Sequence, residues 1–429
     1  MPAVRVGALV SLAVLAQLLG FLVTLAAARL LPVESFEAYV VAAALFILLA
    51  AAAPLGSEKH ALRHLPALLE KADLAQARGL LAFGARQSLG IALILTAGVG
   101  AWALLAGIAP DLRSAVVITC LSLPAGALSH YAVEVLTAAG RPVQALALFR
   151  VAVPAAALAL IGLMAIAPVA PSGAGGIAAW GIGWVVALSA MTAAIARALP
   201  PGWRAISPAG DRTVWKREAR PFFIHRLSMS LFAQTPVLML ELMGAPAGDV
   251  GAYAAAAATA SLITVLATAT NRAYGRELAL HIQSSDAKGI RRLLAERARW
   301  LLPAIMVLLV AMFVLAGPVL SLFRPLFAQT GALPLRILAI GCATTAFFSL
   351  APTMLKFGGQ NAVLYKLLVT AAGVQLALHV ILIPQRGATG AAFAQTATML
   401  LLYGAFAILG LQVRRRKETV LASQSDRAN

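Results

Sequence analysis

One apolar stretch of the chain, residues 221–243, carries polar side chains of types that bind ligands: Arg226, Ser230, Gln234 and Glu241. Successive residues of an α-helix turn by about 100°, so these four lie within about 80° of one another, on one narrow face. A guanidinium can pair with an anion, and hydroxyl and amide groups can hydrogen-bond a polar ligand. We therefore expect this face to bind substrate.

Polar side chains also share one face in two further apolar stretches, 7–28 and 251–271. The members that we expect to line a substrate cavity are Gln17, Thr24, Thr264, Thr268 and Asn271. Hydrogen bonds between neighbouring helices are the alternative explanation, because Ser, Thr, Asn and Gln commonly form them in helix bundles.

Two carboxylates are candidates for coupling transport to an ion, and one proline is a candidate for a hinge. Glu134 and Glu241 are candidates for coupling to an ion, with Glu134 also a candidate for a structural ion pair. Pro236 removes a backbone hydrogen bond from its helix, which predicts a kink and a hinge.

The composition defines the elements that must hold these residues. Apolar residues make up 61% of the 429 residues, charged residues only 12%, and the mean hydropathy is +0.88. A soluble domain carries about 25% charged residues, so the sequence predicts an all-α polytopic membrane protein.

The net charge of +18 does not indicate a nucleic-acid partner, because the basic residues lie between apolar spans, where topology explains them. Cys120 and Cys342 are too few for a disulfide framework or a CxxC metal site.

A helix that crosses a bilayer needs about 20 mostly apolar residues. Twelve stretches fit this criterion: 7–28, 37–56, 84–107, 114–137, 145–167, 175–197, 221–243, 251–271, 300–322, 332–355, 362–383 and 388–411. With both termini on one side, that side holds all Lys and Arg residues except Arg29, Arg113, Arg324, Arg336 and Arg386. The positive-inside rule makes it the cytoplasmic side. The loop 273–299 predicts an amphipathic helix on the inner membrane surface, with ordinary topogenic charge as the alternative.

The two halves of the chain resemble each other. Residues 38–44 recur as 252–258, and 80–86 recur as 293–299, at a nearly constant offset. A duplicated six-helix unit predicts two lobes as a parallel repeat. The expected division is an N-lobe at 1–199, a basic cytoplasmic linker at 200–218, a C-lobe at 219–413 and a basic, polar cytoplasmic tail at 414–429.

Sequence signatures of enzymes are missing. No HExxH, GxSxG or Walker-type loop occurs, and no loop on the outer side is long enough for a catalytic domain. No pore loop of the kind that channels use is visible either. The sequence therefore predicts a transporter rather than an enzyme, with no cofactor and no metal.

Five short segments, spread in order over residues 7–411, resemble one family of transporters. They are Ala28-Arg29-Leu30-Leu31-Pro32, Arg63-His64-Leu65-Pro66, Gly251-Ala252-Tyr253-Ala254-Ala255-Ala256, Leu335-Arg336-Ile337-Leu338-Ala339 and Leu382-Ile383-Pro384-Gln385-Arg386-Gly387-Ala388-Thr389-Gly390-Ala391-Ala392. The family is that of the polysaccharide-biosynthesis (O-antigen flippase-like) proteins of the multidrug/oligosaccharidyl-lipid/polysaccharide exporter superfamily. Leu31-Pro32 lacks the glycine of the family pattern, and Glu37 replaces a second glycine.

The resemblance implies two six-helix lobes in a V-shaped, MATE-like arrangement that opens alternately to either side. It implies a lipid-linked oligosaccharide substrate, an undecaprenyl-pyrophosphate-linked O-antigen or exopolysaccharide repeat unit, flipped across the bacterial inner membrane. Membrane lipids and other polysaccharide-assembly membrane proteins would be the partners. For such a substrate, the positions of the polar residues on their helix faces, rather than the resemblance, assign Arg226 to pyrophosphate and Gln17, Ser230, Gln234 and Asn271 to sugar hydroxyl groups.

Three alternatives stay open at this point. A multidrug/cation antiporter of the same superfamily is expected to hold a carboxylate in its first span, and residues 7–28 contain no Asp or Glu. A membrane glycosyltransferase or polysaccharide polymerase would need a longer outer loop. A major-facilitator transporter would share the repeat, but the loop after the second span lacks its GxxxDR pattern.

Overall fold

The computed structural model describes residues 2–166, 170–284 and 286–428, with the side chains of 2–6, 266, 269, 272–273 and 413–428 left out. Over the residues described, every regular element is a helix and there is no strand. The predicted all-α class is confirmed. The side chains of the predicted basic tail, 414–429, lie outside the described residues.

The chain divides into two compact units. We call Leu18–Gly251 the N-terminal unit, and Ala252–Asn429 together with Met1–Gln17 the C-terminal unit. This division does not follow a boundary near residue 200, because the helix that carries the polar face of 221–243 packs with the N-terminal unit. The division into lobes 1–199 and 219–413 stays a prediction.

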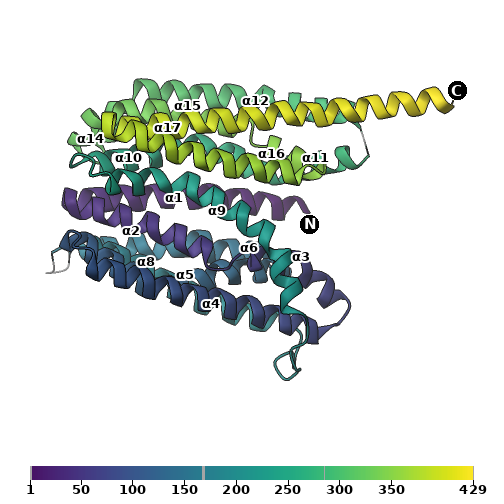
Figure 1. The fold of residues 1–429 in the computed structure, drawn as a ribbon, viewed down its shortest axis with the longest axis horizontal. Helices are drawn as coiled ribbons and strands as arrows, with labels where there is room; N and C mark the ends of the chain where they lie inside the picture. Colours follow the sequence, from purple (N-terminus) through teal and green to yellow (C-terminus); the bar gives the residue numbers. More distant parts are fainter. Residues whose placement is uncertain (1, 167–169, 285, 429) are drawn as a thin grey trace. The chain divides into compact units, whose positions relative to one another are not determined.

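The N-terminal unit is built from long helices that lie side by side (Figure 1). Its elements are part of α1 (Pro2–Leu30), α2 (Val33–Ala52), α3 (Ser57–Glu70), α4 (Leu74–Leu105), α5 (Pro110–Ala138), α6 (Pro142–Leu146), the π-helix η1 (Ala147–Ala152), α7 (Val153–Met164), α8 (Gly173–Ala198) and α9 (Arg212–Leu242). Helix α5 lies at the centre and packs on α2, α4 and α8. Phe46, Leu123, Trp184 and Met191 from these helices form its buried core.

The C-terminal unit repeats this kind of packing around α15 and α17 (Figure 1). Its elements are the first part of α1, most of α10 (Asp249–Ala260), the 3-10 helix η2 (Ser261–Ile263), α11 (Thr264–Gln283), α12 (Ala287–Val314), α13 (Ala316–Ser321), α14 (Pro325–Thr330), α15 (Ala332–Phe347), α16 (Ala351–Phe357) and α17 (Asn361–Ala428). Within α17, Gly387 has φ 50° and ψ −129°, so the range consists of two helices that meet there. Only glycine adopts such a conformation readily.

Nine ranges of the described chain are long and apolar enough to cross a membrane, and one of them, Asn361–Gln412, contains the break at Gly387. Two predicted spans fall below that criterion. The stretch 221–243 lies in α9, which is long enough but not apolar enough, and 251–271 begins with an apolar helix, Asp249–Ile263, that is too short. Large apolar side chains face outward, among them Leu121 at 68% exposure, Val307 at 69% and Leu401 at 65%. Such surfaces are typical of proteins embedded in lipid, and the pattern is consistent with twelve spans.

Side-chain caps fix where several helices begin. Asp73 accepts a hydrogen bond from the Gln76 amide at the start of α4, and Asp211 accepts bonds from Thr213 and Val214 at the start of α9. Asp, Asn, Ser and Thr stabilise a helix N-terminus in this way. Because α9 begins at Arg212, the last part of the predicted linker 200–218 is helical.

The loop 273–299 does not form a separate amphipathic helix, contrary to our expectation. Residues up to Gln283 belong to α11, and residues from Ala287 onwards belong to α12. Ile290 and Leu293 are buried against Leu278 and Ile282, so their apolar face packs on the protein.

Candidate functional site

Arg226, the cation of the predicted substrate face, is engaged with two neighbouring helices. Its Nη2 lies 2.7 Å from Nδ1 of His130 on α5, and its Nε lies 3.6 Å from Oε1 of Glu58 on α3. Glu58 is completely buried. Burial raises the pKa of Glu58, and the Arg226 guanidinium acts in the opposite direction by lowering that pKa. The guanidinium thus compensates a buried carboxylate.

Glu134 is also paired. Nζ of Lys59, the residue after Glu58, lies 2.6 Å from Oε1 of Glu134. Glu58, Lys59, His130, Glu134 and Arg226 therefore form one group, which we call the junction cluster because it joins α3, α5 and α9. The sequence suggested a pair for Glu134 as an alternative to ion coupling, and the structure supplies the partner.

The remaining predicted residues of α9 differ in burial. Ser230 is buried and its Oγ has no hydrogen-bond partner among the residues described, whereas Gln234 and Glu241 are half-buried. Pro236 lies inside α9, which continues as a helix from Arg212 to Leu242. A hinge at Pro236 stays a prediction.

Polar residues predicted on the other spans mostly bond within their own unit. In the C-terminal unit, Nε2 of Gln17 donates to Oγ of Ser261 at 2.7 Å, and Thr264 donates to the carbonyl oxygen of Ser261. Thr268 is exposed. In the N-terminal unit, Thr24 donates to the carbonyl oxygen of Gly20.

Asn271 is hydrogen-bonded to Arg297, a buried cation that the sequence analysis did not predict. Its Oδ1 accepts from Nη2 of Arg297 at 2.8 Å and from Oγ of Ser349 at 3.0 Å. Arg297 is only 3% exposed, and it also donates to the carbonyl oxygen of Phe347. Its guanidinium lies 5.9 Å from the ring centre of Tyr274. Arg297 lies in the stretch 273–299, which we expected at the membrane surface, so the sequence did not predict that its side chain is buried.

A cavity of about 600 Å³ lies between α4 and the first turns of α9, wholly within the N-terminal unit. Apart from Gln87 its polar lining is cationic, and its apolar walls come from both helices. The lining residues are Leu55, Phe83, Arg86, Gln87, Gly90, Ile91, Ile94, Arg212, Lys216, Arg220 and Phe223. We call this cavity the basic pocket. The residues predicted to bind substrate are not among the described residues that line it.

The four cations of the basic pocket are free to meet a ligand. Among the described residues, none forms a hydrogen bond or an ion pair with the side chain of Arg86, Arg212, Lys216 or Arg220, and no Asp or Glu lines the cavity. Arg212, Lys216 and Arg220 recur every four residues and therefore share one helix face. That spacing is visible in the sequence. Because residues 200–218 were predicted to be a linker, the helix face that Arg212, Lys216 and Arg220 share was not predicted.

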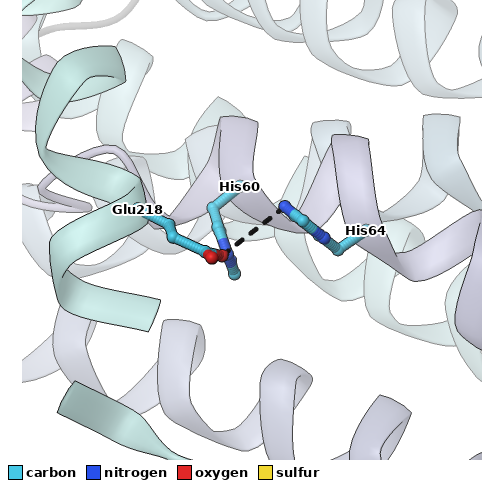
Figure 2. A group of neighbouring side chains, drawn as sticks. All are labelled: His60, His64 and Glu218. Carbon is cyan, nitrogen blue, oxygen red and sulfur yellow. Dashed lines mark hydrogen bonds and ion pairs between the residues drawn. The ribbon is translucent and has the colours of Figure 1, made fainter. Parts of the chain in front are cut away.

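A second group of side chains joins α3 to α9 and has the composition of a metal site. Figure 2 shows His60 and His64 of α3 turned towards Glu218 of α9. Nε2 of His60 lies 2.8 Å from Oε2 of Glu218, and Nε2 of His64 lies 3.7 Å from the same oxygen. The hydrogen bond with His60 is the main cause that lowers the pKa of Glu218.

Comparison with known proteins adds information on the fold. No protein-family model matches the chain, and no curated protein matches its sequence. An inward-facing multidrug resistance MATE family transporter of the MOP superfamily is similar with a TM-score of 0.73 at 14% identity, over 93% of this chain and 96% of that chain. The lipid II flippase MurJ in an inward closed conformation is similar with a TM-score of 0.74 at 14% identity, over 97% and 92%.

A MOP superfamily transporter from Pyrococcus furiosus matches less closely, with a TM-score of 0.63 at 15% identity over 96% of both chains. These likenesses extend over nearly the full length of each protein, while the identities are too low to carry a substrate or a mechanism across. The chain therefore has the fold that MATE transporters and MurJ share.

Proposed function

We propose that this protein flips an anionic lipid-linked oligosaccharide across a bacterial inner membrane by alternating access. An undecaprenyl-pyrophosphate-linked O-antigen or exopolysaccharide repeat unit is the expected substrate. The fold shared with a lipid II flippase and the motifs that resemble polysaccharide-biosynthesis flippases both support this assignment.

The observation that carries the proposal is the basic pocket. A pyrophosphate linked to a lipid presents two chemistries, a compact anion and a long apolar tail. Arg86, Arg212, Lys216 and Arg220 offer unpaired donors for the anion, and charge-assisted hydrogen bonds to phosphate are among the strong ones in proteins. Ile91 and Ile94 supply the apolar wall beside them. A cationic drug would be repelled by the same four side chains.

The predicted cavity residues would bind the substrate after its pyrophosphate has entered the basic pocket. Ser230 has a buried hydroxyl group without a partner among the described residues, so it could bind a sugar hydroxyl without breaking an existing bond. Arg226 would have to leave Glu58 and His130 to reach pyrophosphate. Gln17, Thr24, Gln234, Thr264, Thr268 and Asn271 complete the proposed cavity, and Glu134 and Glu241 remain the candidates for ion coupling.

The main rival is a drug or cation antiporter, because MATE transporters have the same fold. Helix α1 contains no Asp or Glu, so it lacks the carboxylate that we expect such an antiporter to use for binding Na⁺ or H⁺.

The test uses inverted inner-membrane vesicles that contain either the wild-type chain or the double variant Arg86→Ala with Lys216→Ala. We expect the wild type to move a lipid-linked oligosaccharide to the lumenal leaflet and the variant to do so at least about tenfold more slowly. The reason is that each hydrogen bond to a charged group contributes about 1.5–3 kcal/mol, and about 1.4 kcal/mol corresponds to tenfold.

The matched control is Arg291→Ala with Arg292→Ala, which removes two exposed cations of α12 in the C-terminal unit. It should transfer glycolipid like the wild type. Export of a cationic dye without glycolipid transfer would establish the antiporter instead. Unchanged glycolipid transfer in the pocket variant would leave the function intact and remove the basic pocket from it, and Arg226→Ala and Gln234→Ala would then test the predicted cavity.

A further inference from the structure

His60, His64 and Glu218 converge from two helices on one point. The two histidines are four residues apart on α3, so both rings lie on the same face of that helix. Glu218 reaches them from the first turns of α9 (Figure 2). One ligand atom from each residue lies within 4.8 Å of the other two.

The distances match those between ligands of a tetrahedral zinc ion. Zn²⁺ binds nitrogen and oxygen ligands at about 2.0–2.2 Å, which puts two ligand atoms about 3.3 Å apart. The distances of 2.8 Å and 3.7 Å from Oε2 of Glu218 lie on either side of that value. Small side-chain rotations would therefore bring all three groups onto one ion.

The residue types also fit zinc better than magnesium or calcium. Two histidines and one glutamate form a recurring three-ligand set for Zn²⁺, with water in the fourth position. Imidazole suits zinc, whereas Mg²⁺ and Ca²⁺ prefer oxygen ligands. His60 is buried, while the side chains of His64 and Glu218 are 41% and 44% exposed, so an ion can enter from the open side.

We infer that His60, His64 and Glu218 form a zinc site that fastens α3 to the start of α9. The backbones are already close there, because a Cβ placed on Gly56 would lie 2.3 Å from the carbonyl oxygen of Ala219. An ion beside this contact would hold the first turns of α9, and with them the cations Arg212, Lys216 and Arg220. Zinc would bind here whether or not the chain moves a lipid-linked sugar.

The experiment uses the full chain, purified in detergent without a histidine tag and stripped of metal. We expect one Zn²⁺ per chain in calorimetric titration, and Co²⁺ in its place to give the visible absorption of a tetrahedral site. Zinc should raise the apparent melting temperature and slow hydrogen exchange in residues 57–70 and 212–220. Mg²⁺ should do neither.

The variants His64→Ala and Glu218→Gln change exposed side chains, so both are expected to fold. Each should weaken zinc binding at least about tenfold, because loss of a ligand costs no less than loss of a residue that supports one. The matched control is His281→Ala. His281 forms a pair with Asp286 at 3.0 Å. Among the described residues, no third metal-binding side chain lies close enough to make this pair a metal site.

The control should bind zinc like the wild type. Absence of stoichiometric binding, or equal binding by His64→Ala and Glu218→Gln, would show that the three residues form only an ion pair. Loss of binding in the His281→Ala control as well would show that zinc binds elsewhere, and it would also overturn the assignment.

Discussion

At the scale of single residues, Arg226 shows how a predicted binding group can also be structural. Glu58 is fully buried, and a buried carboxylate is stable only when a cation or hydrogen-bond donors compensate the lost hydration. Arg226 supplies that cation at 3.6 Å and also contacts His130. Any role of Arg226 towards substrate would therefore be coupled to the ionisation of Glu58.

The change Arg226→Ala tests this coupling through its dependence on pH. Without the guanidinium, burial loses its largest opposing influence on Glu58 and holds the folded-state pKa further above the unfolded value. A raised carboxyl pKa means that stability falls as pH rises through the unfolded value towards the folded one. We expect a loss of about 3 kcal/mol at pH 8 and a clearly smaller loss near pH 5, because the raised pKa favours protonation of the carboxyl as pH falls. Thermal unfolding at the two pH values measures the difference.

Glu58→Gln in the same variant is the control, because an amide cannot ionise. The double variant should unfold with the same deficit at both pH values. A deficit in Arg226→Ala that does not change with pH would mean that Glu58 does not depend on this cation.

At the scale of elements, α9 presents different chemistry to different neighbours. Arg212, Lys216 and Arg220 face α4 in the basic pocket. Glu218 lies about 120–160° away from them around the helix and meets α3 instead. The start of α9 can therefore line the basic pocket beside α4 and contact α3 at the same time only if its position against α3 is fixed.

Gly56 is the residue that permits this close contact, and Gly56→Ala should disrupt it. Gly56 has φ 83°, and an added Cβ would lie 2.3 Å from the Ala219 carbonyl oxygen and 2.7 Å from the Phe223 amide nitrogen. The left-handed conformation costs about 1–2 kcal/mol for a residue with a side chain. The clash with backbone atoms adds about 1–3 kcal/mol. Thermal unfolding in detergent gives the sum.

Gly140→Ala separates the two contributions. Gly140 has φ 84°, nearly the same conformation, but nothing lies within 4 Å of the position of its Cβ. This variant should lose only the conformational part. Equal destabilisation by both substitutions would argue against close packing of α3 on α9.

At the scale of the whole molecule, the distribution of basic residues predicts that both termini are cytoplasmic. Ala205→Cys and Ala106→Cys test this, because both positions are exposed outside the helices, Ala106 at the end of α4 predicted on the outer side and Ala205 in the linker predicted on the cytoplasmic side. In intact cells an impermeant thiol reagent should label Ala106→Cys and spare Ala205→Cys. A chain with its native Cys120 and Cys342 is the background control, since Cys120 is buried and Cys342 half-buried. Labelling of Ala205→Cys alone would invert the topology.

The sequence by itself determined the all-helical class, the apolar helices and the polar faces of α9 and α11. These are local properties, because hydropathy and periodicity depend on neighbouring residues and on the fixed geometry of a helix. Only the tertiary structure decided which faces meet. The contact of Arg226 with His130 joins residues 96 positions apart, and that of His60 with Glu218 joins residues 158 positions apart. Helix periodicity gives the direction of a side chain around its own axis, while the partner depends on packing between helices that are distant in the chain.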